Sequence, residues 1–158
     1  MDESTTRPNT LLAQLREAKL VHVDARVLAL HLLGDESALT SQVDSVMEAL
    51  KSGAFRAQTS SLSLYQILAE VYRSGQSDLA GEVAKALQVY TGLSMIPATP
   101  DVAVQAAEVR AQLGGRPERA LQIATALVGK AEVYLTTRSG LKRIAGMSVV
   151  NLEDYASN

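Results

Sequence analysis

Apolar and polar residues alternate along the chain in patterns that predict helices separated by short strands. The clearest helical pattern begins at Pro117 and places four residues at the i, i+3, i+4 and i+7 spacing of one helix face. These residues are Ala120, Ile123, Ala124 and Leu127. Proline suits the first turn, where its missing N–H removes no hydrogen bond, and Gly129 is a candidate for the left-handed residue that ends a helix. The β-rich, nearly uncharged segment 133–137 follows, and we predict an interior parallel strand there.

The same patterns extend this alternation over almost the whole chain. Helices are predicted for a short segment that begins at Asn9 and for residues 27–33, 36–51, 62–73, 78–90, 102–113 and 138–144. Strands are predicted for residues 20–24, 55–59, 93–97 and 148–152. Strands of about 5 residues that alternate with helices of about 10 to 14 residues imply parallel strands joined by helical crossovers. We therefore predict an α/β fold, a three-layer α/β/α sandwich with a central parallel sheet of four or five strands.

Polar residues that precede the predicted helices are candidate caps, and one of them is also a candidate for chemistry. Ser60 or Ser61 would cap the helix that follows, and so would Thr99 or Asp101. Asp24 ends the first predicted strand and turns directly into a helix, an arrangement found at the carboxyl edge of open α/β sheets, where ligands bind. The alternative for Asp24 is an N-cap that accepts hydrogen bonds from backbone N–H groups.

The length and composition of the chain indicate one ordinary domain of 158 residues. We expect a flexible N-terminal tail over residues 1–8 and a single domain over residues 9–158. No uninterrupted apolar run approaches the roughly 18 residues needed to span a bilayer, and the polar, acidic N-terminus has no apolar signal segment. The absence of cysteine excludes disulfides and thiolate chemistry. A cytoplasmic protein without membrane contact is the simplest expectation.

Charge is distributed unevenly along the chain, whose net charge is −2. Residues 110–143 contain seven basic and two acidic residues, a balance of +5, and the remainder contains eight basic and fifteen acidic residues, a balance of −7. The basic stretch predicts either a surface for a polyanion or an acidic partner, or solvated helix faces with Lys and Arg near C-terminal turns.

Three segments of the chain together resemble PIN-domain proteins, the small ribonucleases that include the VapC-type toxins of toxin–antitoxin modules. The segments are VHVDARVLALHLLG at 21–34, QTSSLSLYQILAEV at 58–71 and RPERALQIATALVGKAEVYLTTRSGLKRIAGMSVVNL at 116–152. The resemblance implies a cluster of three or four acidic side chains at the carboxyl edge of a parallel sheet. In the family these acids bind Mg²⁺ or Mn²⁺, which activates a water and offsets phosphate charge during phosphodiester hydrolysis.

The resemblance also implies where those acids belong, and only the first is present here. Asp24 matches the first acid, although Arg26 replaces the small polar residue that usually follows two positions later. Gln66 stands in the place of the second acid, Arg119 in that of the third and Arg138 in that of the fourth. Guanidinium groups repel divalent cations and pair with carboxylates. We therefore predict that the metal site and its Mg²⁺ or Mn²⁺ cofactor are absent, with arginine as the counter-charge of Asp24.

The alternative is a metal site rebuilt from other acids, in an active Mg²⁺- or Mn²⁺-dependent ribonuclease that uses Asp24 with Glu70 or Glu118. Glu118 adjoins the third position, but one residue is ~100° of helix rotation, which directs it elsewhere. Glu70 lies one helical turn after Gln66 and on the same face.

Other residues that often carry chemistry have simpler interpretations in this sequence. His22 lies two residues before Asp24 on a predicted strand and is expected to be partly buried and hydrogen-bonded. His31 falls within an apolar helix, and Ser60 and Ser61 have no evident base partner.

The leading functional hypothesis is therefore a degenerate PIN domain that has lost nuclease activity and acts by binding. Arg26, Arg119 and Arg138 are candidates for binding an anion such as an RNA phosphate. The other candidate partner is an antitoxin-like protein, because VapC-type toxins are held by partners whose segments lie across the active groove. A homodimer is also expected, since family members commonly pair through helices next to the site.

Overall fold

A five-stranded parallel sheet forms the centre of the computed structural model, which describes residues 10–35, 37–137, 140–141 and 143–155. Its strands are β1 (Val21–Val23), β2 (Ala57–Ser60), β3 (Leu93–Ile96), β4 (Val133–Thr136) and β5 (Ser148–Asn151). All neighbouring strands pair in parallel, in the order β3-β2-β1-β4-β5. The predicted parallel sheet is confirmed, and the expected tail over residues 1–8 lies outside the described residues.

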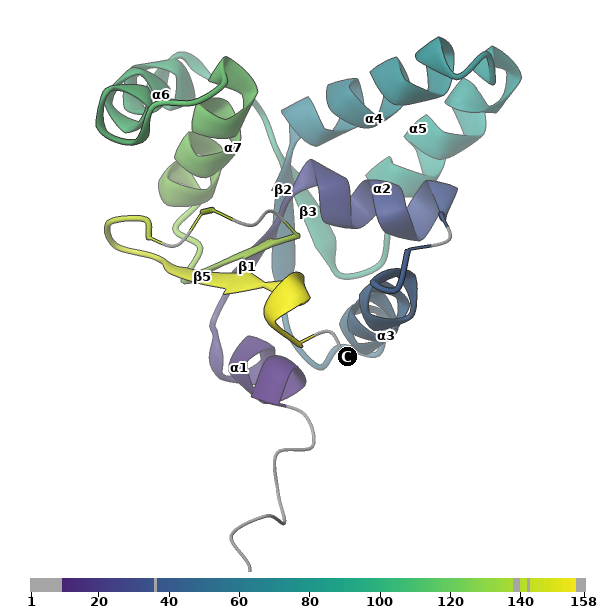
Figure 1. Cartoon of the computed structure of the whole chain (residues 1–158), viewed down its shortest axis with the longest axis horizontal. Helices are drawn as coiled ribbons and strands as arrows, with labels where there is room; N and C mark the ends of the chain where they lie inside the picture. The colour runs from purple at the N-terminus through teal and green to yellow at the C-terminus, as the bar shows by residue number, and fades with distance from the viewer. Residues whose placement is uncertain (1–9, 36, 138–139, 142, 156–158) are drawn as a thin grey trace, which may run out of the picture.

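Helices cover both faces of this sheet (Figure 1). They are α1 (Thr10–Glu17), α2 (Ala25–Leu33), α3 (Thr40–Lys51), α4 (Ser61–Arg73), α5 (Ala80–Gln88), α6 (Pro100–Leu113) and α7 (Pro117–Val128). Short 3-10 turns, η1 (Ser77–Leu79) and η2 (Leu152–Tyr155), complete the described elements. Figure 1 shows α6 and α7 together on one side and α2 to α5 on the other, which is the predicted three-layer sandwich.

Two apolar cores result from the period-2 alternation of side chains along the strands. Val21, Val23 and Leu135 belong to a core with α1 to α5, whereas Tyr134 belongs to a second core with α6 and α7. β1 and β4 are interior strands that are buried along their whole length. Their buried polar residues include His22 and Thr136, and the His22 ring lies on the α7 face of the sheet beside Tyr134.

The helix starts follow the predicted caps in most cases. Ser60 caps α4 and Thr99 caps α6, each by accepting a hydrogen bond from a backbone N–H. The helix predicted for residues 36–51 begins only at Thr40. Residues 38–39 form a turn before it, because the Asp35 carboxylate accepts hydrogen bonds from the Ser37 N–H at 2.8 Å and from the Thr40 hydroxyl at 3.0 Å. The helix predicted for residues 78–90 is shorter as well, with a 3-10 turn before it.

Two predictions about the stretch from Pro117 to Ile144 are wrong. Gly129 has an ordinary right-handed conformation, and Lys130 takes the left-handed one with φ of 61°. The helix predicted for residues 138–144 is not seen in residues 140, 141, 143 and 144, which the structure describes. There Gly140 has φ of +94° and Ile144 bridges to Met147 across a tight turn, neither of which a helix permits.

Candidate functional site

Three of the predicted site residues, Asp24, Gln66 and Arg119, lie together at the carboxyl ends of β1 and β4. From β1 the sheet extends to β2 and β3 on one side and to β4 and β5 on the other, so the strand order reverses between β1 and β4. Open parallel sheets bind ligands at such a switch point. A pocket lies here, lined in part by Asp24, Arg26, Gln66, Glu118 and Arg119. Its volume of about 20 Å³ admits little more than one water-sized group.

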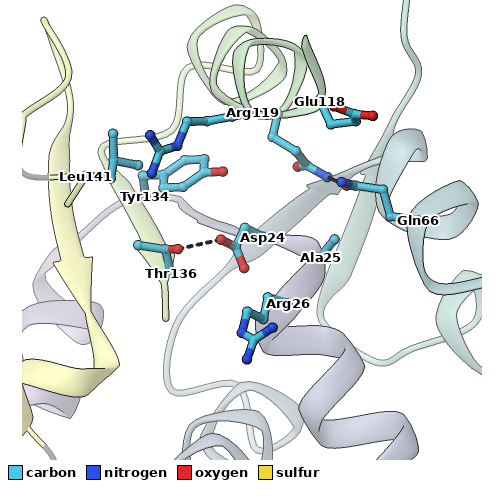
Figure 2. A pocket seen from close by; sticks show the side chains of 10 residues that line it. Asp24, Ala25, Arg26, Gln66, Glu118, Arg119, Tyr134, Thr136 and Leu141 are labelled. Carbon is cyan, nitrogen blue, oxygen red and sulfur yellow. Dashed lines mark hydrogen bonds between the residues drawn. The ribbon is translucent and has the colours of Figure 1, made fainter. Parts of the chain in front are cut away.

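Asp24 is a buried carboxylate whose two oxygens both accept hydrogen bonds. Oδ1 accepts from the Val27 N–H at 3.1 Å, so Asp24 is the N-cap of α2. Oδ2 accepts from the Thr136 hydroxyl of β4 at 2.5 Å (Figure 2). Both the cap and the position at the ligand-binding edge, offered by the sequence as alternatives, therefore apply to this residue. Thr136 was not anticipated as its partner.

Of the arginines predicted as the counter-charge of Asp24, the structure describes Arg26 and Arg119. Neither Arg26 nor Arg119 forms an ion pair with Asp24 in the part of the chain that the structure describes. Figure 2 shows Arg119 extended toward Tyr134, while Arg26 projects from the other side of Asp24. The Nε of Arg119 is buried and has no hydrogen-bond partner among the described residues. Arg138 lies outside the described residues.

A buried network of neutral polar groups lies against this pocket, and its centre is Gln122 of α7. The Gln122 amide nitrogen donates to Ser63 Oγ at 2.8 Å and to Gln66 Oε1 at 2.9 Å. Its Oε1 lies 3.0 Å from His22 Nε2, which must donate because an amide oxygen only accepts. The network therefore joins β1, α4 and α7 and fixes the amide orientation of Gln66. Gln122 was not predicted as a site residue, and its only signal in the sequence is a glutamine among the small and apolar residues of a buried helix.

His22 is a structural residue and remains uncharged at neutral pH. Its ring is fully buried and stacks on Tyr134 with 5.3 Å between ring centroids. Burial lowers the pKa of His22 to about 4, and the hydrogen bond to Gln122 opposes that shift only in part. The predicted hydrogen-bonded histidine is confirmed, and it is more deeply buried than expected.

The two acids proposed for a rebuilt metal site do not converge with Asp24. Glu118 lines the pocket wall, but Figure 2 shows its carboxylate directed away from Asp24. Glu70 is exposed and forms an ion pair with Arg73 one helical turn away. Among the residues that the structure describes, no three His, Cys, Asp or Glu side chains form a group able to hold a metal ion.

The described donor set therefore does not fit the Mg²⁺ or Mn²⁺ that the family resemblance implies. These ions take several oxygen ligands, and the pocket directs a single carboxylate toward its centre. A divalent ion about 5 Å from the Arg119 guanidinium would be repelled by on the order of several kcal/mol at an effective dielectric near 20. The pocket instead combines one hydrogen-bonded carboxylate with the guanidinium groups of Arg26 and Arg119, whose positive charge attracts an anionic group rather than a cation.

No family model matches the sequence, and no curated protein matches it. Solved structures do match. One is the VapBC2 complex from Rickettsia felis bound to a promoter DNA fragment, at 13% identity and a TM-score of 0.63 over 84% of this chain and 98% of that chain. A second is a toxin–antitoxin complex from Klebsiella pneumoniae, at 16% identity and a TM-score of 0.60 over 84% and 97% of the two chains.

In the described part of this chain, no helix is both long and apolar enough to cross a membrane.

A third similar structure is VapC20 from Mycobacterium tuberculosis, a toxin that cleaves the sarcin–ricin loop, at 18% identity and a TM-score of 0.56 over 72% and 86% of the two chains. At these identities the likeness concerns the fold. The chain has the PIN fold of the VapC toxins, as the resemblance in its sequence predicted.

Proposed function

We propose that this protein is a VapC-like PIN domain that no longer cleaves RNA and acts by binding a partner. The observation that supports this most is the state of Asp24. Both of its oxygens are occupied by hydrogen bonds from Val27 and Thr136, and Arg119 lines the same pocket. A carboxylate held in this way, without neighbouring acids, is poorly placed to hold a metal that activates water.

An antitoxin-like protein is the partner that we propose. Two of the similar structures are complexes of a toxin with its antitoxin. The Arg119 Nε and the Gln66 amide nitrogen, which donate to no described residue, could bind acceptors on a segment of another protein. RNA is the second candidate partner, favoured by the arginines that line the pocket. A cytoplasmic location and pairing into a homodimer belong to the same proposal.

Calorimetric titration with Mn²⁺, together with an RNA cleavage assay, tests the loss of metal chemistry. Asp24→Asn is the matched variant, since asparagine is as good an N-cap as aspartate and removes the charge, while its amide nitrogen replaces the oxygen that accepts from Thr136. We expect no saturable Mn²⁺ binding in either protein and no Mn²⁺-dependent cleavage. Saturable binding that disappears in Asp24→Asn would instead establish the rival, a ribonuclease rebuilt around Glu70 or Glu118.

A further inference from the structure

We propose that a groove between α4 and α7 binds an acidic segment of the partner protein, whose carboxylates reach Gln66 and Arg116. This inference rests on the proposed function and adds the chemical class of the ligand. The groove has a volume of about 430 Å³ and is lined by Tyr65, Gln66, Ala69, Arg73, Arg116 and Glu118. It adjoins the pocket at the switch point, since Gln66 and Glu118 line both.

Gln66 presents its amide nitrogen to this surface because the buried network holds its oxygen. Gln122 donates to Gln66 Oε1 at 2.9 Å, and Gln122 is itself oriented by His22 and Ser63. The Gln66 amide nitrogen makes no hydrogen bond to any described residue. The Gln66 amide N–H groups are therefore held in a fixed orientation and are free to donate to an acceptor on a ligand. A carboxylate oxygen fits such a donor better than a cation does.

The charge around the groove is also complementary to an acidic ligand. The charged residues that line the groove or the adjoining pocket are four arginines and two carboxylates, a balance of +2 on a chain of net charge −2. Arg73 is partly neutralised by its ion pair with Glu70. Arg116 and Arg119 form no ion pair within the described ranges, which leaves both guanidiniums available to a ligand.

A peptide suits this surface better than a nucleic acid does. Tyr65 is 62% exposed at the groove, and an exposed aromatic ring beside arginine is typical of the centre of a protein interface. Nucleic-acid sites usually present a broad basic face, whereas here Glu118 interrupts a small group of arginines in an acidic protein. An extended segment with spaced carboxylates and intervening apolar side chains would match both the arginines and the tyrosine.

Fluorescence anisotropy with a labelled peptide of five glutamates alternating with five tyrosines tests the inference. We expect saturable binding that weakens about tenfold or more in Arg116→Gln, because a charge-assisted hydrogen bond is lost. Arg116 makes no side-chain cap bond, so this change leaves α7 intact. Arg56→Gln is the matched control: Arg56 is exposed and precedes β2, at the opposite edge of the sheet, and its loss should leave the affinity unchanged.

Two further measurements sharpen the assignment. A peptide with glutamine in place of every glutamate should bind at least tenfold more weakly, and the side-chain amide resonances of Gln66, assigned with Gln66→Met, should shift as the acidic peptide is added. The inference would be overturned if the acidic peptide did not bind, if the neutral peptide bound equally well, or if the two arginine variants had equal effects. It would also be overturned if a ten-nucleotide uridine RNA bound more tightly than the peptide in an Arg116-dependent way.

The two proposals fail in distinguishable ways. If the acidic peptide does not bind and Mn²⁺ does not bind either, only the acidic partner is wrong. If Mn²⁺-dependent cleavage of RNA is found, the proposed loss of activity is wrong whatever the peptide does.

Discussion

His22 illustrates how a single polar residue is stabilised inside this protein in its neutral form. The sheet and α7 exclude water from the ring, Tyr134 stacks on one face, and Gln122 accepts the proton of Nε2. Protonation would place a charge in this interior without any described carboxylate partner, because Nδ1 has no hydrogen-bond acceptor among the described residues. The neutral ring is therefore part of the folded state.

We expect His22 to make the protein less stable in mild acid. Its pKa is about 4 in the folded state and 6.5 as a free side chain, so only the unfolded chain takes up this proton between those values. The free energy of unfolding should fall as pH decreases through that window, by on the order of 3 kcal/mol. Urea denaturation at pH 7 and pH 4 measures this change. His22→Phe keeps a stacked ring and should lose that part of the pH dependence; an unchanged dependence would contradict the assignment.

Gln122 is the residue that organises the polar side chains beside the pocket. A neutral network that fixes Gln66 replaces the charged cluster that a metal would need. The sequence correctly predicts that Gln66 and Arg119 lie near Asp24, but it does not reveal that Gln122 orients the Gln66 side chain. An amide within a helix pattern usually indicates a solvent face, and only the packing of α7 on β1 shows that this one is buried.

The junction of α7 with the sheet depends on close packing between elements. Gly129 follows the last turn of α7 directly above β2, and a Cβ atom at this position would lie 2.4 Å from Gln58 Nε2. Gln58 is itself buried and its amide approaches the Ala126 carbonyl. A side chain at position 129 would have to displace the buried Gln58 amide, which explains the glycine, whereas Lys130 adopts the left-handed conformation.

We therefore expect Gly129→Ala to destabilise the protein by about 1–3 kcal/mol, the usual cost of overpacking a buried contact. The control is Gly81→Ala in α5, where no atom lies near the new methyl group and φ is not positive. That change should instead stabilise the protein by up to about 1 kcal/mol through helix propensity. Thermal or urea unfolding of both variants measures the difference. Gln58→Ala should relieve the defect of Gly129→Ala in the double variant, and two variants that shift in the same direction would contradict this account.

At the level of elements, the parts predictable from the sequence are those whose signals are local. The 3.6-residue and two-residue periods and the caps Ser60 and Thr99 predict the helices and strands of the sandwich. The failures occur where contacts distant in sequence decide the conformation. The sequence predicted the left-handed conformation for Gly129, but the glycine there is explained by its contact with Gln58, and Lys130 is left-handed instead. Ile144, predicted to end a helix, bridges to Met147.

The whole molecule combines the parallel sheet of a PIN fold with a switch point where Gln66 and Arg119 stand in place of two expected acids. The strand order β3-β2-β1-β4-β5 places β1 beside β4 and so brings Asp24 and Thr136 together. The sequence could therefore locate the site through Asp24. It could not give the directions of the side chains around it, since the extension of Arg119 toward Tyr134 depends on how α7 and β4 pack.

If missing acids are what exclude the metal, restoring them should restore metal binding. The variant Gln66→Glu with Arg119→Asp makes the pocket more negative by three charges. We expect it to bind Mn²⁺ at least about tenfold more tightly than the natural chain, since both attraction and ligand number increase. Calorimetry measures this, and Arg56→Asp with Gln88→Glu is the control of equal charge on exposed positions outside the pocket.

The same restored variant connects the metal proposal with the acidic-partner proposal. Because Gln66→Glu replaces the donor amide with a carboxylate, and Arg119→Asp reverses a neighbouring charge, binding of the glutamate–tyrosine peptide should fall as Mn²⁺ binding rises. A restored variant that keeps full peptide affinity would place the peptide elsewhere on the molecule. A variant that gains no Mn²⁺ binding would mean that the geometry of this edge, and not only its charge, excludes the metal.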